Sequence, residues 1–210
     1  EAEIIQAWRD EQTTHGCEIE AHLLDVADGG ACTALASQLQ DQHGPCSVLV
    51  NAAGITRDAT LRKLEPEDWR AVIASNLDSV YNLSRPLLNG MIGAGFGRII
   101  NISSVNGQKG QMGQTNYSAA KAGMHGFTMA LAQEVAAKGI TVNTISPGYI
   151  DSPMIRRVPA NIRESILNSV PAGRFGLPIE IAHAVCFLAS ANAAYITGAN
   201  LPVNGGLFMH

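Results

Sequence analysis

Two short runs decide the fold class: VLVN at Val48 to Asn51 and RIINI at Arg98 to Ile102. Both are nearly continuous apolar runs, which is typical of strands buried on both faces of a sheet. Runs of this kind alternate with longer segments of helical period. We predict strands at Glu20 to Asp25, Ser47 to Asn51, Arg98 to Ser103, Thr141 to Ser146 and Asn200 to Val203. We predict helices at roughly Glu1 to His15, Gly30 to His43, Glu65 to Met91, Thr115 to Lys138 and Pro178 to Ser190.

This alternation predicts βαβ units, and therefore an α/β fold with a doubly wound parallel sheet that helices cover on both faces. No internal repeat, low-complexity segment or linker divides the sequence, so we predict one domain over residues 1–210. The Pro-containing stretch from Ser146 to Pro159 is predicted to be a long loop. Loops of that length in compact domains are usually functional, so we predict that this one is a lid.

Composition limits the classes of function. The 210 residues are 46% hydrophobic and 15% charged, which is enough apolar material for a sizeable core. A net charge of -4 without any Lys/Arg-rich block argues against a nucleic-acid partner. No run of about eighteen apolar residues could span a membrane, and EAEIIQAWRDEQ at the N-terminus lacks the layout of a signal peptide, so we predict a cytoplasmic location. The four cysteines form no CxxC pair and no metal-type spacing with the six histidines, so we predict no metal site.

Small residues and glycines follow the predicted strands at five successive ends. The clusters are Asp25-Val26, Asn51-Ala52-Ala53-Gly54, Ser103-Ser104, Pro147-Gly148-Tyr149 and Asn204-Gly205-Gly206. In an open parallel sheet, ligands bind beyond the carboxyl ends of the strands, and small residues let the backbone approach a flat ligand closely. Ordinary turns also use glycine and asparagine, so any one cluster alone favours a turn. Five together favour a binding site.

Tyr117 and Lys121 indicate the chemistry of this site, since residues four apart lie on one face of a helix. An unperturbed tyrosine titrates near pH 10, and a cation within about 4 to 6 Å lowers that pKa. Ser104 ends a strand, where its hydroxyl could donate to the oxygen that Tyr117 protonates. Such a set suits proton transfer at a carbonyl or alcohol oxygen, as hydride transfer to a carbonyl requires. An isolated YxxxK would more often be only a helix face.

Five motifs in register resemble the nicotinamide-dependent short-chain dehydrogenase/reductase family over nearly the whole chain. They are NAAG at Asn51 to Gly54, ASNLDSVYN with Asn76, the spacing from Ser104 to YxxxK, SPGYI at Ser146 to Ile150 and VNGG at Val203 to Gly206. The resemblance implies a Rossmann-like sheet. It also implies a catalytic set that consists of Asn76, Ser104, Tyr117 and Lys121.

The resemblance assigns a role to each member of this set. Tyr117 would be the general acid in reduction, and Ser104 would hold the substrate oxygen. Lys121 would bind the nicotinamide ribose and lower the pKa of Tyr117, while Asn76 would anchor a proton-relaying water. Independently, asparagine is a poor helix former, so its position inside a predicted helix hints at a local break.

The resemblance further implies a nicotinamide cofactor, with NADPH preferred over NADH. The implied cofactor residues are Asp25, Val26, Asn51, Ala52, Ala53, Gly54, Tyr117, Lys121, Pro147, Gly148, Ile150 and Ser152. Family relatives often have a threonine followed by an acid after the SPGYI motif, where this chain has Asp151-Ser152-Pro153. Ser152 would keep the hydroxyl that contacts the nicotinamide carboxamide, and Pro153 would stiffen the lid.

Within the family the chain is most similar to the reductases of acetoacetyl-CoA, which make (R)-3-hydroxybutyryl-CoA for polyhydroxybutyrate synthesis. The similarity lies in GITRD at Gly54 to Asp58 and in SSVNGQKGQMGQTNYSAAKAG at Ser103 to Gly123. It implies an acyl-CoA substrate whose thioester end accepts hydrogen bonds from Gln111 and Gln114, with help from Asp58 and Tyr149. A solvated polar loop is the other interpretation of the two glutamines. The resemblance also implies a homotetramer built through the two long helices.

Two alternatives stay open. Acyl-carrier-protein reductases share the catalytic set, and a basic patch for an acidic carrier would distinguish them; Arg156, Arg157 and Arg163 are candidates for it. A non-catalytic subunit or fragment is the other alternative, because this sequence has no TGxxxGxG turn of the kind that holds the pyrophosphate in the family. The glycines at Gly93 to Gly97 precede a strand instead of following one and cannot replace it. About 35 to 40 residues of a first βαβ unit are absent from the sequence, and we expect the working protein to have them.

Overall fold

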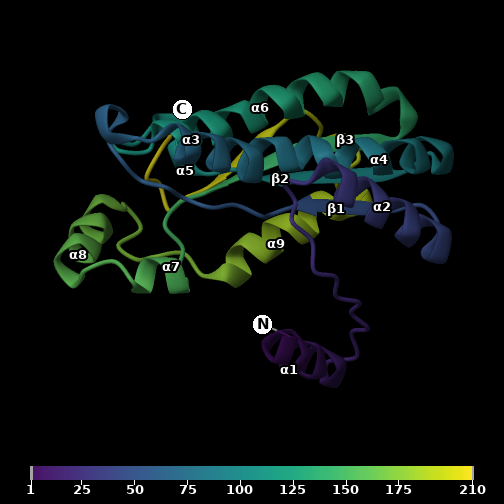
Figure 1. Cartoon of the computed structure of the whole chain (residues 1–210), viewed down its shortest axis with the longest axis horizontal. Coiled ribbons are helices and arrows are strands. Elements are labelled where there is room, and N and C mark those ends of the chain that lie inside the picture. Colours follow the sequence, from purple (N-terminus) through teal and green to yellow (C-terminus); the bar gives the residue numbers. More distant parts are fainter. Residues whose placement is uncertain (1, 210) are drawn as a thin grey trace.

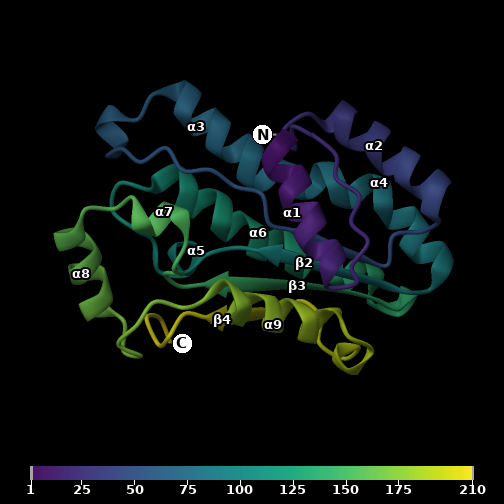
Figure 2. The ribbon, with the colours of Figure 1, turned by 90° about the horizontal axis from the view of Figure 1, so that it is seen from below.

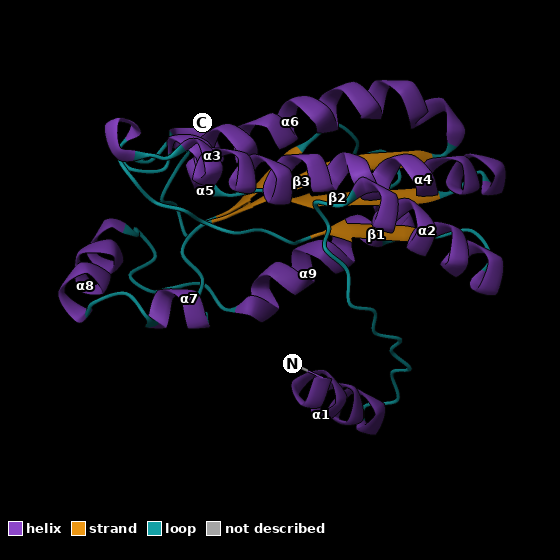
Figure 3. Ribbon diagram, in the orientation of Figure 1, coloured by secondary structure: helices purple, strands orange, loops and turns teal. Residues whose placement is uncertain are grey.

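The computed structural model describes residues 2–209, and within that range it contains a parallel sheet of four strands. The strands are β1 (Val48–Asn51), β2 (Gly97–Ile102), β3 (Ile140–Pro147) and β4 (Asn200–Val203), adjacent in that order. The register places Val48 opposite Arg98, Gly97 opposite Ile140, and Thr144 opposite Asn200. Figure 1 and Figure 3 show this sheet at the centre of the molecule. The predicted α/β fold and four of the five predicted strands are confirmed.

Helices cover both faces of the sheet because successive residues of a strand point to opposite sides. Ile99 packs against α4 (Ser79–Ala94) and α6 (Thr115–Val135), in a buried cluster that includes Met91 and Leu131. Its neighbour Ile100 packs on the other face, with Leu188 of α9 (Pro178–Ala189). In Figure 1, α6 lies above the sheet and α9 below it. The RIINI run is therefore buried on both faces, and the doubly wound arrangement is confirmed.

The remaining helices surround this core. They are α1 (Ala2–Thr14), α2 (Gly29–His43), α3 (Pro66–Ile73), α5 (Val105–Lys109), α7 (Pro153–Arg156) and α8 (Ala160–Ser169). Short 3₁₀ turns occupy Leu61–Lys63, Ala136–Lys138 and Ala191–Ala193, and a π-helical segment occupies Ala74–Asp78. Figure 2 shows α2 alongside α4, against which it packs. Figure 1 shows α1 apart from the sheet, at the end of an irregular segment.

The predicted strand at Glu20 to Asp25 is wrong. This segment is irregular, because a strand needs a neighbour for its backbone N–H and C=O groups and none pairs with these residues. β1 pairs with β2 alone in the described chain. The first residue of the predicted N-terminal helix, Glu1, lies outside the described residues.

Three further predictions need correction. The helix predicted from Glu65 to Met91 is divided into α3, the π-helical segment and α4. The glycine- and glutamine-rich stretch after Ser104 contains the short helix α5, and the predicted lid loop contains α7, which begins with Pro153 at its first position. Proline is favoured there because its fixed φ suits a helix start. The helix α8 was not predicted.

A close approach of two turns depends on glycine at position 139, between α6 and β3. Gly139 has φ +76°, and a Cβ built there would collide with the carbonyl oxygen of Gly95. Gly139→Ala is expected to lower the free energy of unfolding by about 2 to 3 kcal/mol, since it combines a left-handed backbone with an overpacked contact. Urea denaturation checks this value.

Gly93→Ala is the matched control for that substitution. Gly93 lies in the last turn of α4 with nothing within 4 Å of a built Cβ. Alanine in a helix is favoured over glycine, so this variant is expected to be neutral or stabilised by up to about 1 kcal/mol. Equal destabilisation of the two variants would contradict the collision with Gly95.

Among residues 2–209, no helix combines the length and the apolar character that crossing a membrane would require.

Candidate active site

The residues that follow the four parallel strands meet at one edge of the sheet, and Gly54, Asn76 and Lys121 come together there. A Cβ built on Gly54 would lie 2.5 Å from Asn76 Oδ1 and 3.5 Å from Lys121 Nζ. The absence of a side chain at position 54 therefore permits this close approach.

Asn76 holds the turn after β1 through its side chain. Its Oδ1 accepts from the N–H of Ile55 at 2.8 Å, and its Nδ2 donates to the carbonyl of Ile55 at 2.8 Å. The residue is fully buried and lies in the π-helical segment Ala74–Asp78. The predicted local break in the helix is thus confirmed, and π-helical segments are frequent at functional sites.

Lys121 is a buried cation on α6. Its Nζ donates to the carbonyl of Ile102 at the end of β2, at 2.8 Å, and makes a weak contact with Met124 Sδ at 3.9 Å. None of the ion pairs found in the described chain involves it. An ammonium group has three N–H donors, so the carbonyl of Ile102 and the weak sulfur contact leave one N–H for a ligand. This arrangement fits the ribose hydroxyls of a nicotinamide cofactor.

Burial lowers the pKa of Lys121 from its ordinary value of 10.5 to about 8. Between these two pH values the unfolded chain binds more protons than the folded one, so the free energy of unfolding rises with pH across that window. We expect the rise between pH 7.5 and 9.5 to be about 2 kcal/mol for the unmodified protein and to be absent in Lys121→Met. Urea denaturation of both proteins at the two pH values measures it. A difference between the two proteins that stays constant with pH would contradict the buried, depressed lysine.

Tyr117 lies one turn before Lys121 on α6, with Lys121 Nζ 5.8 Å from the centre of its ring. The one-face arrangement predicted from YxxxK is present. The predicted lowering of the tyrosine pKa by the lysine is not found: burial raises the pKa of Tyr117, Asp58 adds to the rise, and only the hydrogen bond with Ser104 opposes it. The physical reason is that desolvation disfavours phenolate more than the hydrogen bond with Ser104 favours it. The tyrosine is thus kept protonated, as a proton donor must be.

Ser104 lies two residues after the end of β2 and immediately before α5. Its Oγ accepts from the N–H of Asn106 at 3.1 Å, which makes it the N-cap of that helix. Capping uses only the oxygen lone pairs. The hydroxyl proton remains available to the phenol or to a substrate oxygen, as the Ser104 role requires.

The predicted substrate residues divide into two groups. Gln114 Nε2 donates to Asp58 Oδ2 at 2.9 Å, and Gln114 Oε1 accepts from Asn106 Nδ2 at 2.9 Å. Asp58 and Gln114 therefore lie together, and Gln114 also contacts Asn106 of α5. Gln111 is exposed and accepts from Lys109 Nζ at 3.0 Å, so it is not joined to that pair.

Tyr149 lies elsewhere, on the segment that follows β3. It is half-buried, burial raises the pKa of its phenol, and it lines a small cavity with residues that follow β4. Among the described hydrogen bonds, none joins Tyr149 to Asp58 or Gln114.

Hydrogen bonds fix several of the predicted cofactor residues. Asn51 donates through Nδ2 to Asn101 Oδ1 at 2.9 Å, inside the sheet, while Ala52 and Ala53 lead from it into the turn at Gly54. Asp25 Oδ1 accepts from the N–H of Ala27, and the carbonyl of Val26 accepts from Asn82 Nδ2 on α4 at 3.0 Å. These bonds place Asp25 and Val26 in the turn before α2.

The remaining predicted cofactor residues follow β3. A Cβ built on Gly148 would lie 2.8 Å from the Cα of Asn204, so the backbones after β3 and β4 touch at Gly148. Pro147 is the last residue of β3, and Ile150 forms a β-bridge with Gly176. Ser152 stands at the N-cap of α7.

His125 is a site-supporting residue that the sequence reasoning missed. Ser103 Oγ donates its only proton to the carbonyl of Lys121 at 2.8 Å, so the 3.0 Å contact with His125 Nε2 requires an N–H on that nitrogen. The same nitrogen lies 3.3 Å from Ser146 Oγ, which donates to Asn200 Oδ1. The imidazole thus links α6 to Ser103, which follows β2, and to Ser146 of β3, which in turn is bonded to Asn200 of β4. Its place one turn after Lys121 was the only signal in the sequence.

Asn116 was also missed. Its Nδ2 donates to the carbonyl of Arg57 at 2.9 Å, and its Oδ1 accepts from the N–H of Tyr117 at 2.8 Å. The residue is fully buried. Asn116 fixes the start of α6 against the segment that contains Arg57 and Asp58.

A fold with helices on both faces of a parallel sheet, and a tyrosine, lysine, serine and asparagine gathered at the carboxyl edge, defines a class of reductase. The chain belongs to the short-chain dehydrogenase/reductase family: the family model described as enoyl-(acyl carrier protein) reductase matches residues 3–208. It is an oxidoreductase of a family that uses a nicotinamide cofactor.

Within the family, the chain is similar to two proteins named acetoacetyl-CoA reductase. That of Allochromatium vinosum is 53% identical over 210 residues, which are 100% of this chain and 85% of the relative. That of Cupriavidus necator is 48% identical over 204 residues, 97% of this chain and 83% of the relative. A 3-oxoacyl-[acyl-carrier-protein] reductase of Pseudomonas aeruginosa is 49% identical over 195 residues, 93% of this chain and 79% of the relative.

Proposed function

We propose that this protein reduces the 3-oxo group of acetoacetyl-CoA with NADPH and releases (R)-3-hydroxybutyryl-CoA. The observation that carries the proposal is the position of the buried Lys121 Nζ, 5.8 Å from the centre of the Tyr117 ring and 3.5 Å from a Cβ built on Gly54. The names of the acetoacetyl-CoA reductases at 53% and 48% identity support the choice of substrate.

The catalytic roles follow from the contacts of each side chain. When bound, the cofactor supplies hydride to the carbonyl carbon. Tyr117 gives its phenolic proton to the carbonyl oxygen, and the Ser104 hydroxyl, whose proton is not used in capping α5, donates to the same oxygen. Donors aimed at an oxygen where negative charge develops lower the barrier.

Lys121 and Asn76 act around this pair. Lys121 would hold a ribose hydroxyl of the cofactor through the N–H that its protein contacts leave available. Asn76 fixes the turn from Gly54 to Ile55 that borders this space. The oxygen and nitrogen of its amide each make a hydrogen bond to Ile55. A water bound to Asn76 would therefore use the oxygen or the nitrogen alongside its bond to Ile55.

At the substrate end, Asp58 and Gln114 form the polar wall. Gln114 is held by Asp58 on one side and by Asn106 on the other, which fixes the amide beside the Ser104 loop. An amide in a fixed orientation can recognise a thioester carbonyl at low entropic cost. Gln111, which is exposed, would reach the substrate only through movement of the loop between Lys109 and Gly113.

The remaining features of the proposal are NADPH as the preferred cofactor, a cytoplasmic location and a homotetramer. The outward faces of α4 and α6 support the tetramer. They form a groove of about 300 Å³ that is lined by Tyr81, Leu88, Phe127 and Leu131, and Tyr81 is about half exposed. Apolar surface between two long helices is typical of subunit contacts. Light scattering of the purified protein would give the subunit number.

The test is consumption of NADPH or NADH with acetoacetyl-CoA, run beside an acetoacetyl group on acyl carrier protein. Faster turnover of the CoA substrate with NADPH is the expected result. Preference for the carrier protein would transfer the activity to fatty-acid synthesis, in line with the Pseudomonas aeruginosa relative. A folded protein that turns over neither substrate would overturn the proposal and favour a non-catalytic role.

A further inference from the structure

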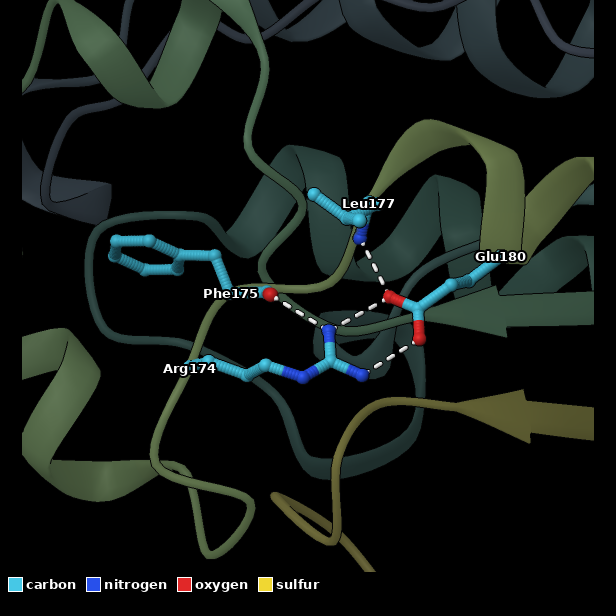
Figure 4. Close-up of polar contacts among 4 residues, drawn as sticks. All are labelled: Arg174, Phe175, Leu177 and Glu180. Atoms are coloured by element: carbon cyan, nitrogen blue, oxygen red, sulfur yellow. Dashed lines mark hydrogen bonds and ion pairs between the residues drawn. The ribbon is translucent and has the colours of Figure 1, made fainter.

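Arg174 and Glu180 form a two-pronged ion pair outside the catalytic set. Nη2 of the arginine lies 2.7 Å from Glu180 Oε1, and Nη1 lies 2.8 Å from Glu180 Oε2 (Figure 4). The paired guanidinium holds the pKa of Glu180 down to about 2, so the carboxylate is ionised at any pH used for assay. Bidentate pairs of this kind fix geometry more strictly than single contacts.

The same two side chains also bind the backbone between them. Glu180 Oε2 accepts from the N–H of Leu177 at 2.7 Å, at the start of α9, and Arg174 Nη1 donates to the carbonyl of Phe175 at 3.1 Å. Figure 4 shows these bonds closing the segment from Arg174 to Leu177 into one compact turn. We call this turn, residues 174–177, the clamp turn.

The clamp turn carries Gly176, and Gly176 holds the segment that follows β3. Its N–H donates to the carbonyl of Tyr149 at 3.0 Å, and its carbonyl accepts from the N–H of Asp151 at 2.8 Å. A Cβ built on Gly176 would lie 2.6 Å from Ile150 Cδ1, so the Ile150 side chain packs closely on the backbone of Gly176. Residues 149–151 lead directly into Ser152 and α7.

A cavity of about 80 Å³ borders this segment, and its lining includes Tyr149, Ile150, Val170, Val203 and Arg174. Side-chain packing around Tyr149 and Ile150 is therefore incomplete. A segment beside such a space keeps its position through its backbone bonds. Two of those bonds end on Gly176.

We infer that Arg174 and Glu180 are positioning residues for the cofactor-binding segment 149–152, acting through the clamp turn. The inference rests on the proposed function, because it needs a bound nicotinamide cofactor, for which the family resemblance implies Ile150 and Ser152 as binding residues. The ion pair itself is exposed, and exposed pairs contribute little to global stability. Its effect is therefore expected in the binding of the cofactor and not in the folding of the chain.

The test compares Glu180→Ala and Glu180→Gln with Glu67→Ala. Glutamine keeps an acceptor for the Leu177 N–H and loses the charge, so it separates the cap from the ion pair. Glu67 is the matched control, since it also stands in the first turn of a helix, is exposed and contacts an arginine, Arg70, at 3.3 Å. It has no link to residues 149–152 among the described contacts.

We expect Glu180→Ala to raise the KM for NADPH about tenfold, with kcat within about threefold of the unmodified protein and the melting temperature within about 3 °C. The KM of Glu180→Gln for NADPH should lie between those of the unmodified protein and Glu180→Ala. Glu67→Ala should leave this KM unchanged. A KM that stays within twofold in Glu180→Ala, or a rise of equal size in Glu67→Ala, would overturn the inference.

Amide hydrogen exchange gives a second readout that needs no turnover. Loss of the clamp should raise exchange at the N–H groups of Asp151 and Gly176 in Glu180→Ala and not in Glu67→Ala. This arm separates the inference from the proposed substrate, because it applies even to a protein that reduces neither thioester. Unchanged exchange at both groups would show that the clamp turn does not hold residues 149–151.

Discussion

Tyr117→Phe is expected to reduce kcat for acetoacetyl-CoA by about 10³-fold, within the range that a positioned general acid contributes. The substitution removes one oxygen and its proton while it keeps the ring, so α6 and the approach of Lys121 to the ring at 5.8 Å should be preserved. Burial already keeps the phenol protonated in this structure. Loss of the hydroxyl therefore leaves the developing alkoxide without its proton source. Steady-state consumption of NADPH measures the effect.

The matched control is Tyr195→Phe, since Tyr195 is fully exposed. It should leave kcat and KM unchanged. Binding of NADPH to Tyr117→Phe, followed by fluorescence, should stay within about twofold of the unmodified protein, because Lys121 keeps its donors. Retention of more than a tenth of kcat in Tyr117→Phe would rule out this phenol as the proton donor.

Asn76→Leu is expected to abolish activity and to lower the free energy of unfolding by about 2 to 5 kcal/mol. The amide satisfies both the N–H and the carbonyl of Ile55 in a fully buried position. Leucine has nearly the same volume and leaves both groups unpaired, and each buried unpaired group costs about 1 to 3 kcal/mol. Urea denaturation and the NADPH assay measure the two effects.

Asn76→Asp and Asn161→Ala are the two controls for Asn76→Leu. The first tests which bond to Ile55 matters for stability, and the second tests the loss of an exposed asparagine. Aspartate keeps the acceptor for the Ile55 N–H but places an oxygen against the Ile55 carbonyl, so its cost should persist and should ease only where the carboxyl is protonated at low pH. Asn161 is exposed on α8, and its replacement should change stability by less than about 0.5 kcal/mol. An Asn76→Leu protein as stable and active as Asn161→Ala would contradict the role given to this amide.

Part of the proposed catalytic set could be predicted from local spacing, and the family resemblance supplied the rest. Tyr117 and Lys121 share a face by helix geometry alone, and Ser104 follows a strand that its apolar run identifies. The break at Asn76 was indicated by a single unfavourable residue in a helical pattern, although its π-helical form was not. Asp58 and Gln114, far apart in the chain, were grouped through the family resemblance, and the structure brings them into contact.

Other features could not be predicted, because they arise from contacts between distant segments. The segment Glu20 to Asp25 has the pattern of a strand, but a strand also requires a paired neighbour. The pKa of Tyr117 depends on how much water the surrounding loops exclude, which spacing does not reveal. The roles of His125 and of the clamp turn depend on which backbones touch across the sheet edge.

By itself, the sequence determined the parallel α/β class, four of the strands and the placement of Tyr117 and Lys121 on one helix face, because periodicity and short spacings are properties of neighbouring residues. Only the tertiary structure decided which polar groups are buried, which partner each one meets and which proton each one keeps. Burial and hydrogen bonding are properties of the assembled layers: desolvation acts on Tyr117 and Lys121 only after the strand ends, α6 and the loop at Gly54 have closed around them.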